Sequence, residues 1–229
     1  MLGLGNRRRG LFVKLPSTEV IDLVAASGHD FAVVDLEHSQ LSEETARALL
    51  RHARAIGLPA LVRVPQLDRG AVNRLLEAGA AGIQLSTVRR AAEVHELRAA
   101  MRYAPDGNRS ISLAHPQAGY GATRLADYLA RQAAEPPLLV AQIETARTQD
   151  PLDEILAERP DVVFLGMTDL SVDLGLDASR VRARVEEVAD AAERAAVPLG
   201  AFGLDDPRVV YHLVASDLTL LRAAVVDAA

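Results

Sequence analysis

The sequence has no cysteine and no tryptophan, and only 3% of its 229 residues are aromatic. The lack of cysteine excludes disulfide bonds and thiolate catalysis. A core with so few rings must be built from Val, Leu, Ile and Ala, which is typical of parallel sheets covered by helices. Because 49% of the residues are hydrophobic, the chain can bury a sizeable core, and its length fits one domain over residues 1–229.

Basic clusters and long apolar runs are also scarce. The net charge is −6 and no basic stripe interleaved with aromatic residues occurs, which argues against a nucleic-acid partner. The cluster 7–9 of three arginines is typical of a solvated chain end. No apolar run approaches the roughly 18 residues of a membrane span, and the start lacks a signal-peptide pattern. We therefore expect a cytoplasmic protein with a small-molecule substrate and no membrane partner.

Short runs rich in Val, Ile and Leu alternate with segments of helical periodicity, which indicates βα units. The predicted strands are 10–15, 31–35, 60–64, 82–85, 138–143, 162–165, 198–202 and 213–215. Eight such units without a linker predict an α/β fold, a single (β/α)₈ TIM barrel. An open doubly wound sheet is the alternative, and the lack of Gly-x-Gly-x-x-Gly after the first strand weakens it.

One stretch, residues 104–122, interrupts this alternation after the fourth unit and is rich in Gly, Pro and small residues. Long loops in compact domains are usually functional or disordered. Two interpretations follow: the stretch covers the mouth of the barrel, or it is a surface excursion without a role in the site.

Two carboxylates, Glu144 and Asp169, each follow an apolar run that reads as a strand. Both should therefore emerge at the C-terminal face of the barrel, where such folds place their chemistry. A pair of carboxylates there suits a hard divalent cation and leaves coordination positions for a 2-oxo acid. Alternatively, Asp169 is a helix N-cap.

A second group of polar residues follows the runs 31–35 and 60–64. His38 is the natural proton carrier near neutral pH, and a carboxylate beside it, from Asp35 or Glu37, would fix its tautomer. Arg63 stands inside an apolar run, where a guanidinium is costly to bury unless it meets an anion. That anion is either a substrate oxygen or an internal carboxylate. Alternatively, His38 is a loop histidine without a catalytic role that forms a salt bridge with a neighbour.

Six segments together resemble the HpcH/HpaI family of metal-dependent aldolases that act on 2-oxo acids. They occur in the family's order and close to its spacing, from about residue 10 to the end of the chain. They are Val33-Val34-Asp35-Leu36-Glu37-His38, Val62-Arg63-Val64-Pro65, Leu75-Leu76-Glu77-Ala78-Gly79-Ala80, Arg102-Tyr103-Ala104-Pro105-Asp106-Gly107-Asn108-Arg109, Gln142-Ile143-Glu144-Thr145 and Phe164-Leu165-Gly166-Met167-Thr168-Asp169-Leu170-Ser171.

The resemblance implies a barrel of the phosphoenolpyruvate/pyruvate-binding type and a role for each matching residue. Glu144 and Asp169 match metal ligands for Mg²⁺, Mn²⁺ or Co²⁺. Arg63 matches the arginine at the keto or enolate oxygen. His38, supported by Asp35, matches the proton-transfer histidine. The remaining matches contact substrate: Gln142 in the pocket wall, and Gly166, Thr168 and Asp169 around the carboxylate.

The resemblance also implies a homo-oligomer, a trimer of dimers, and the sequence departs from the family in several places. Glu77 stands where an Asp commonly reaches the neighbouring subunit's site. Ser86 and Met167 each replace a usual Pro, and the segment from Arg109 onward is altered, with His115 a candidate substrate contact. The short C-terminus leaves the exchange of a helix between subunits open.

Three functions remain. The first is a metal-dependent aldolase, a carbon–carbon lyase that cleaves or forms a 2-keto-4-hydroxy acid through a pyruvate enolate. The second is a citrate-synthase-like condensation of oxaloacetate with acetyl-CoA, as in siderophore pathways, suggested by the altered loop 108–121. The third is a non-catalytic binding barrel, which the presence of His38, Arg63, Glu144 and Asp169 opposes. A Schiff-base aldolase is disfavoured because Lys14 is the only lysine.

Overall fold

A computed structural model describes residues 2–228 and has a closed barrel of eight parallel strands in the order β1 to β8. The α/β barrel prediction is therefore confirmed, and the open-sheet alternative is wrong. The strands are β1 (Arg8–Val13), β2 (Phe31–Asp35), β3 (Ala60–Val64), β4 (Gly82–Leu85), β5 (Leu138–Ile143), β6 (Val162–Leu165), β7 (Leu199–Phe202) and β8 (Val209–Ser216).

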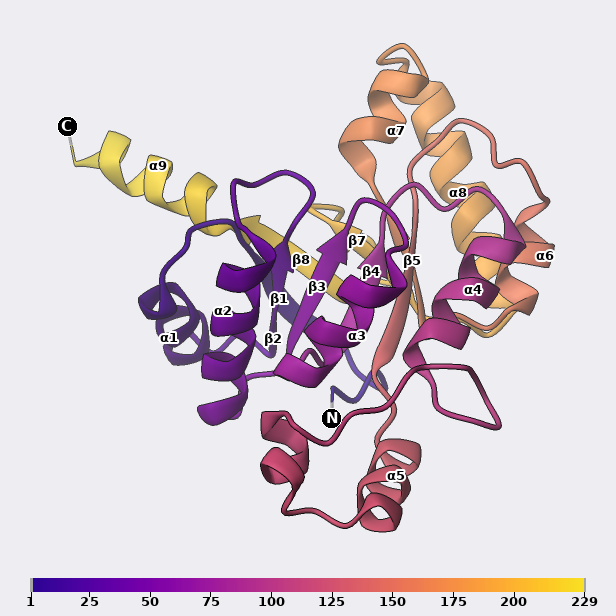
Figure 1. Ribbon diagram of the computed structural model, residues 1–229. Helices are drawn as coiled ribbons and strands as arrows, with labels where there is room; N and C mark the ends of the chain where they lie inside the picture. The colour runs from indigo at the N-terminus through magenta and orange to yellow at the C-terminus, as the bar shows by residue number, and fades with distance from the viewer. Residues whose placement is uncertain (1, 229) are drawn as a thin grey trace.

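Helices follow the strands and surround the barrel (Figure 1). They are α1 (Thr18–Ala26), α2 (Glu43–Ala55), α3 (Arg69–Ala78), α4 (Ala91–Met101), the 3₁₀ helix η1 (Pro116–Gly121), α5 (Leu125–Ala134), α6 (Leu152–Ala157), α7 (Met167–Asp173), α8 (Ala178–Arg194) and α9 (Asp217–Asp227). Two of these helices begin at a side-chain cap: Ser42 before α2 and Asp68 before α3 accept the backbone N–H of Thr45 and Ala71. Among residues 2–228, no helix is both long and apolar enough to cross a membrane.

The few aromatic residues are concentrated inside the barrel. The ring of Tyr211 stacks on Phe31 at 4.4 Å and meets Phe164 edge-on at 5.9 Å. All three side chains are at most 1% exposed. A second apolar layer of Val, Leu, Ile and Ala lies between the strands and the helices. The strands are therefore buried on both faces, which explains their nearly continuous apolar runs.

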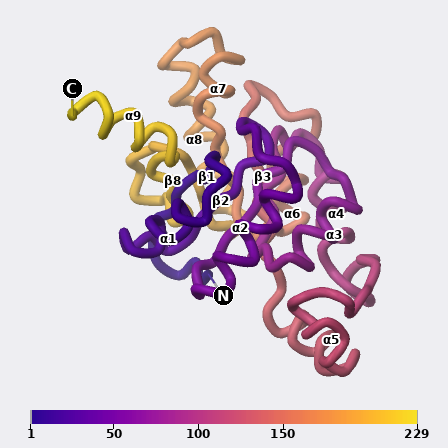
Figure 2. The backbone as a smooth tube through the Cα atoms, turned by 60° about the vertical axis from the view of Figure 1, so that its left-hand side comes forward, coloured from indigo at the N-terminus to yellow at the C-terminus, as the bar shows by residue number. Residues whose placement is uncertain are grey.

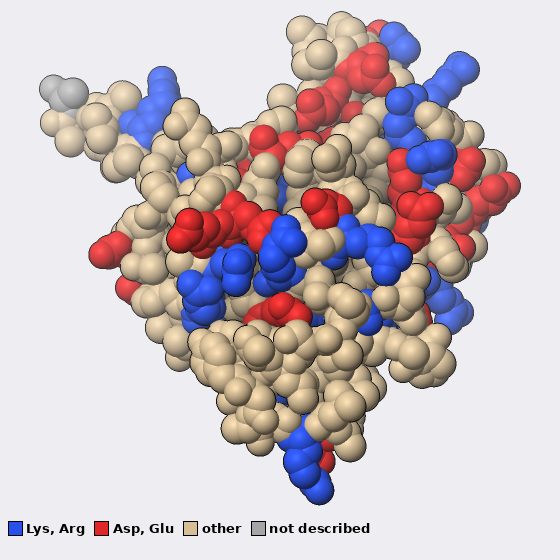
Figure 3. All heavy atoms as spheres, viewed as in Figure 1, with Lys and Arg blue, Asp and Glu red and all other residues tan. Residues whose placement is uncertain are grey.

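Two segments project from the barrel in both ribbon views, the arm of residues 104–137 and helix α9 (Figures 1 and 2). The arm carries η1 and α5 and extends from the end of the barrel where the strands begin. The surface of the arm seen in Figure 3 is largely uncharged. Acidic and basic side chains mix on the surface over α2 and α3, where Arg74 pairs with Glu43. The stretch 104–122 thus does not cover the mouth of its own barrel.

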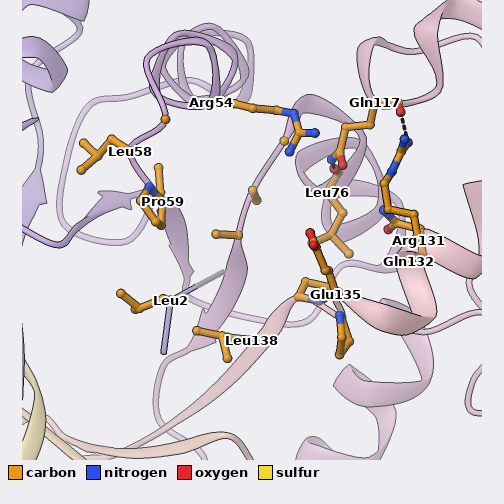
Figure 4. Close-up of a pocket in the computed structure, with 17 residues that line it drawn as sticks. Leu2, Arg54, Leu58, Pro59, Leu76, Gln117, Arg131, Gln132, Glu135 and Leu138 are labelled. Carbon is orange, nitrogen blue, oxygen red and sulfur yellow. Dashed lines mark hydrogen bonds between the residues drawn. The ribbon is translucent and has the colours of Figure 1, made fainter. Parts of the chain in front are cut away.

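A cavity of about 220 Å³ separates this arm from the barrel (Figure 4). Leu58, Leu76 and Leu138 form part of its wall, and Arg54 and Glu135 extend along it. These residues lie near the starts of β3 and β5, at the opposite end of the barrel from the predicted site. Enzymes with this fold have their active sites at the C-terminal ends of the strands. We therefore assign no part of the reaction to this cavity.

Candidate active site

The first half of the site is an ion pair between neighbouring strands. Asp35 ends β2 and lies directly opposite Arg63 in β3. Arg63 donates from Nε to Asp35 Oδ1 at 2.9 Å and from Nη2 to Oδ2 at 2.6 Å. Its guanidinium also lies over the Phe12 ring, 4.4 Å from the centroid. This bidentate, stacked geometry fixes the guanidinium plane.

The carboxylate of Asp35 is fully buried but charged. Burial alone would raise its pKa, yet the hydrogen bonds and charge of Arg63, with a further bond from Lys14, hold the pKa well below its ordinary value. Asp35 Oδ1 also accepts the backbone N–H groups of Glu37 at 3.0 Å and His38 at 3.2 Å. Asp35 therefore organises both Arg63 and the turn that follows β2.

The carboxylate paired with the His38 ring belongs to Glu37, whereas Asp35 contacts His38 through the backbone N–H. Glu37 Oε2 lies 3.8 Å from His38 Nε2 and 3.3 Å from Arg63 Nη1. It also accepts the Ser86 hydroxyl at 2.6 Å. The strand ends at Asp35, so strand alternation no longer determines where the next side chains point. His38 itself is exposed, and its ring faces solvent at the mouth.

Glu144 is the centre of the second half. It follows β5 and is only 4% exposed. Its Oε1 accepts both the backbone N–H of Thr87 at 2.7 Å and the Thr87 hydroxyl at 2.6 Å. Gln142 Nε2 donates to the other oxygen, Oε2. Thr87 has a φ of 51°, a left-handed conformation that is rare for a β-branched residue and is often found at functional sites.

A line of hydrogen bonds crosses the barrel interior to reach Glu144. The Tyr211 hydroxyl donates to Gln84 Oε1 at 3.4 Å, and Gln84 Nε2 donates to Gln142 Oε1 at 2.6 Å. Gln142 then donates to Glu144. Three buried residues from β8, β4 and β5 thus orient one carboxylate.

The charge around Glu144 is not compensated by the protein. Burial raises its pKa, the bonds from Thr87 and Gln142 lower it, and the negative charges of Glu37 and Asp169 raise it again. Within residues 2–228, no Lys, Arg or His forms an ion pair with Glu144 or Asp169. A buried carboxylate with like charges beside it is unfavourable unless a cation binds. The donor set therefore fits a hard divalent cation.

Asp169 reaches the site from the first turn of α7, directly after β6. The N-cap of this helix is Gly166 and not Asp169, so the N-cap alternative is wrong. A side chain at position 166 would overlap Glu144 Oε2, which explains the glycine. No group of three or more His, Cys, Asp and Glu side chains arranged for a metal occurs in the described part of the chain. A metal here would rest on two protein carboxylates, with the other positions left to substrate and water.

Two predicted residues lie outside this cluster. Glu77 is near the end of α3, where its Oε1 accepts from Asn73 at 3.3 Å. His115 is 5% exposed and packs edge-on against Tyr128 at 5.4 Å. Both belong to the contact of α3 with the arm and do not line the mouth of their own barrel.

In the sequence, Ser86 stood out only as a departure from the family, Thr87 had no predicted role and Lys14 was expected within the first strand. The dipeptide Ser86–Thr87 follows β4 and joins the halves of the site, because Ser86 donates to Glu37 and Thr87 donates to Glu144. Strand β1 ends at Val13, which puts Lys14 at the mouth. Two hydroxyl residues directly after the end of β4 were the signal in the sequence that could have indicated their place in the site.

Comparisons with known proteins identify the family of the chain. The family model for HpcH/HpaI aldolase/citrate lyase matches residues 8–222. The hydroxypyruvate/pyruvate aldolase of Roseovarius nubinhibens is 32% identical over 213 residues, covering 91% of this chain and 82% of that protein.

Solved structures with the same fold are also similar to this chain. The HpcH/HpaI aldolase of Desulfitobacterium hafniense superposes with a TM-score of 0.89 at 28% identity, covering 98% of this chain and 92% of that chain. The citrate synthase SbnG has a TM-score of 0.84 at 24% identity, over 98% of this chain and 92% of that chain, a likeness that shows the fold alone. The chain belongs to the HpcH/HpaI aldolase/citrate lyase family.

Proposed function

We propose that the chain is a metal-dependent carbon–carbon lyase that cleaves or forms a 2-keto-4-hydroxy acid through a pyruvate enolate. One observation carries the proposal: the Ser86–Thr87 dipeptide joins a fixed guanidinium system, through Glu37, to the uncompensated carboxylate of Glu144. A 2-oxo acid needs both elements, a cation for its carboxylate and keto oxygens and a positive group where enolate charge develops. The aldolase name of the Roseovarius relative supports this class of reaction.

Glu144 and Asp169 would hold the metal, because carboxylate oxygens suit a hard divalent cation. The resemblance to the family implies Mg²⁺, Mn²⁺ or Co²⁺. When bound, the metal supplies Lewis acidity that lowers the free energy of the substrate enolate. Gln142 keeps Glu144 oriented and forms part of the pocket wall. Gly166 leaves room for the Glu144 carboxylate, and backbone N–H groups of Thr168 and Asp169, in the first turn of α7, face the substrate carboxylate.

Arg63 stabilises the negative charge that develops on the substrate oxygen. Its guanidinium is already held by Asp35 and Glu37, so little reorganisation accompanies the reaction. His38 takes or returns the hydroxyl proton of the aldol, through water, at its exposed ring. Glu37 Oε2 lies 3.8 Å from His38 Nε2 and is the carboxylate beside this ring. Asp35 acts one step further away, by holding Arg63 and the backbone of the turn.

The test is exchange of the methyl protons of pyruvate with deuterium, followed by proton NMR, with Mg²⁺, Mn²⁺ or Co²⁺ added. We expect exchange with at least one metal and its loss in Arg63→Ala and Glu144→Gln. Arg89→Ala serves as a matched control, because Arg89 is an exposed arginine beyond the Ser86–Thr87 dipeptide. Absence of exchange with every metal would contradict the proposal. Formation of citrate from oxaloacetate and acetyl-CoA without pyruvate exchange would establish the condensation instead.

No feature of the chain favours that condensation. The prediction rested on the altered loop 108–121, and this loop lies in the arm beyond the start of the strands. We infer that Glu77 and the arm belong to contacts between copies of the chain, in a homo-oligomer. Light scattering of the wild type and of Glu77→Arg tests this, and a monomeric wild type would contradict it.

A further inference from the structure

Lys14 is the only lysine of the sequence and stands at the mouth of the barrel. It directly follows β1 (Arg8–Val13), and its side chain is only 16% exposed. A long cationic side chain is rarely buried to this extent unless it is paired. The proposed reaction gives Lys14 no role, so its placement needs a separate explanation.

The ammonium group has two partners in the site. Lys14 Nζ donates to Asp35 Oδ2 at 2.6 Å and to the backbone carbonyl of His38 at 2.9 Å. Asp35 Oδ2 is also the oxygen that accepts from Arg63 Nη2 at 2.6 Å. Two cations thus hold one buried carboxylate oxygen: Lys14, directly after β1, and Arg63 in β3, the two strands that flank β2.

The turn after β2 is held from both sides. Asp35 Oδ1 accepts the backbone N–H of His38, and Lys14 Nζ donates to the carbonyl of the same residue. Both polar groups of the His38 backbone are therefore fixed although its ring is exposed. Without Lys14, that carbonyl would lose its side-chain donor.

The backbone of Lys14 is itself anchored by a buried carboxylate. Asp217, the first residue of α9, accepts the N–H groups of Lys14 and Leu15 through Oδ2, each at 2.8 Å. Asp217 is 7% exposed. The backbone of Lys14 and the end of its side chain are thus held by different elements. Such support at both ends places a side chain precisely.

We propose that Lys14, anchored by Asp217, is a positioning residue that sets the His38 turn for proton transfer and the Arg63 guanidinium for charge stabilisation. The inference rests on the proposed function. Lys14 Nζ is bound to a buried carboxylate and to a backbone carbonyl, so it is not free to attack a substrate carbonyl. Lys14 acts through Asp35 and His38 and does not contact substrate.

Kinetics of Lys14→Met and Lys14→Arg test the role. Lys14→Met keeps the apolar stem and removes the charge and the donors. We expect the maximal rate of pyruvate exchange to fall about ten- to a hundredfold, because small misplacements of reacting groups cost this much. The affinity for Mn²⁺, measured by electron paramagnetic resonance, should stay within about twofold, because Glu144 and Asp169 are untouched. Lys14→Arg should restore part of the rate.

A single lysine also permits a readout that does not need activity. In protein labelled with ¹⁵N-lysine, one Nζ resonance is expected, shifted from that of free lysine and slow to exchange with water. It should become like free lysine in Asp35→Asn. In Lys14→Met, the His38 ring resonances should shift while those of His95, an exposed histidine on α4, stay unchanged.

The outcomes separate the two proposals. An inactive wild type with every metal would overturn the proposed function, whereas an active wild type with an equally active Lys14→Met variant would overturn only the positioning role. Loss of Mn²⁺ affinity in parallel with the rate would also overturn it, because the effect would then not be specific to the His38 turn.

Discussion

Adding one methyl group at Gly166 tests the metal site without removing any functional side chain. The backbone there has φ −85° and ψ 83°, angles that alanine can adopt. A Cβ at this position would lie 2.6 Å from Glu144 Cβ and would overlap Glu144 Oε2. Since carbon atoms in contact normally lie about 3.5–4.0 Å apart, Glu144 must withdraw by about 1 Å.

That displacement breaks the hold on the carboxylate. The bonds from Thr87, now 2.7 and 2.6 Å, would lengthen beyond hydrogen-bond range if Glu144 moves away from them. Loss of such supporting contacts usually lowers metal affinity about 10- to 100-fold. Overpacking should also lower the free energy of unfolding by about 1–3 kcal/mol.

The assay is titration of Mn²⁺ by electron paramagnetic resonance, alongside urea denaturation. Gly5→Ala is the matched control, because no atom lies within 4 Å of a Cβ there, and it should match the wild type in both measurements. A Gly166→Ala protein that binds Mn²⁺ as tightly as the wild type would refute the reasoning, since the metal would then not depend on the position of Glu144.

Three further predictions concern the buried pairs. In Arg63→Met, the Asp35 carboxylate keeps Lys14 as its only cationic partner, so urea denaturation should show a loss of about 3–5 kcal/mol in the free energy of unfolding. Adding Asp35→Asn should recover part of it, and purely additive losses would count against the pairing. Burial alone would raise the pKa of Asp35, but Arg63 and Lys14 hold the pKa low in the folded protein. The Asp35 carboxylate therefore stabilises the fold at any pH above the pKa of about 4 that it has in the unfolded chain. This stabilisation is lost as the pH falls below that value. Asp35→Asn should therefore be less stable at pH 7 but decline less between about pH 5 and pH 2 than the wild type, and parallel curves would refute this. Tyr128 is the one buried residue of α5 and bonds to the Tyr103 hydroxyl at 3.0 Å, so Tyr128→Ala should speed tryptic cleavage of the arm while pyruvate exchange is retained; unchanged cleavage would mean that other contacts hold α5.

The sequence predicted the strands well where both faces are buried. The runs 31–35, 60–64, 82–85, 138–143 and 162–165 agree with the structure, because a parallel strand under helices is apolar along its whole length. The ends of the first and last strands were less accurate. Arg8 and Arg9 lie in β1, and β8 begins at Val209, since only part of each strand is buried and charged or aromatic residues interrupt the pattern.

For the site, the sequence placed Glu144, Asp169 and Asp35 at strand ends and Arg63 inside a strand, where an ion pair with Asp35 or Glu37 was one of the two expectations and is present. It did not determine the contacts of Glu144 or of the His38 ring. The side chain that approaches His38 depends on the turn after β2, where strand alternation no longer applies. The contacts of Glu144 depend on Thr87, whose left-handed φ leaves no trace in hydrophobic periodicity. The sequence pattern therefore did not predict the conformations of loops that depend on side chains distant in sequence.

The hydrogen-bond line from Tyr211 to Glu144 has a fixed direction. Each glutamine gives one proton and receives one, so the orientation of both amides is determined by the two ends, a phenol that donates and a carboxylate that accepts. Burial raises the pKa of Tyr211, which keeps that donor proton in place. A residue that resembles ordinary packing in β8 is therefore linked through hydrogen bonds to the carboxylate that follows β5. Replacing it offers a way to retune the site without altering any group that substrate touches.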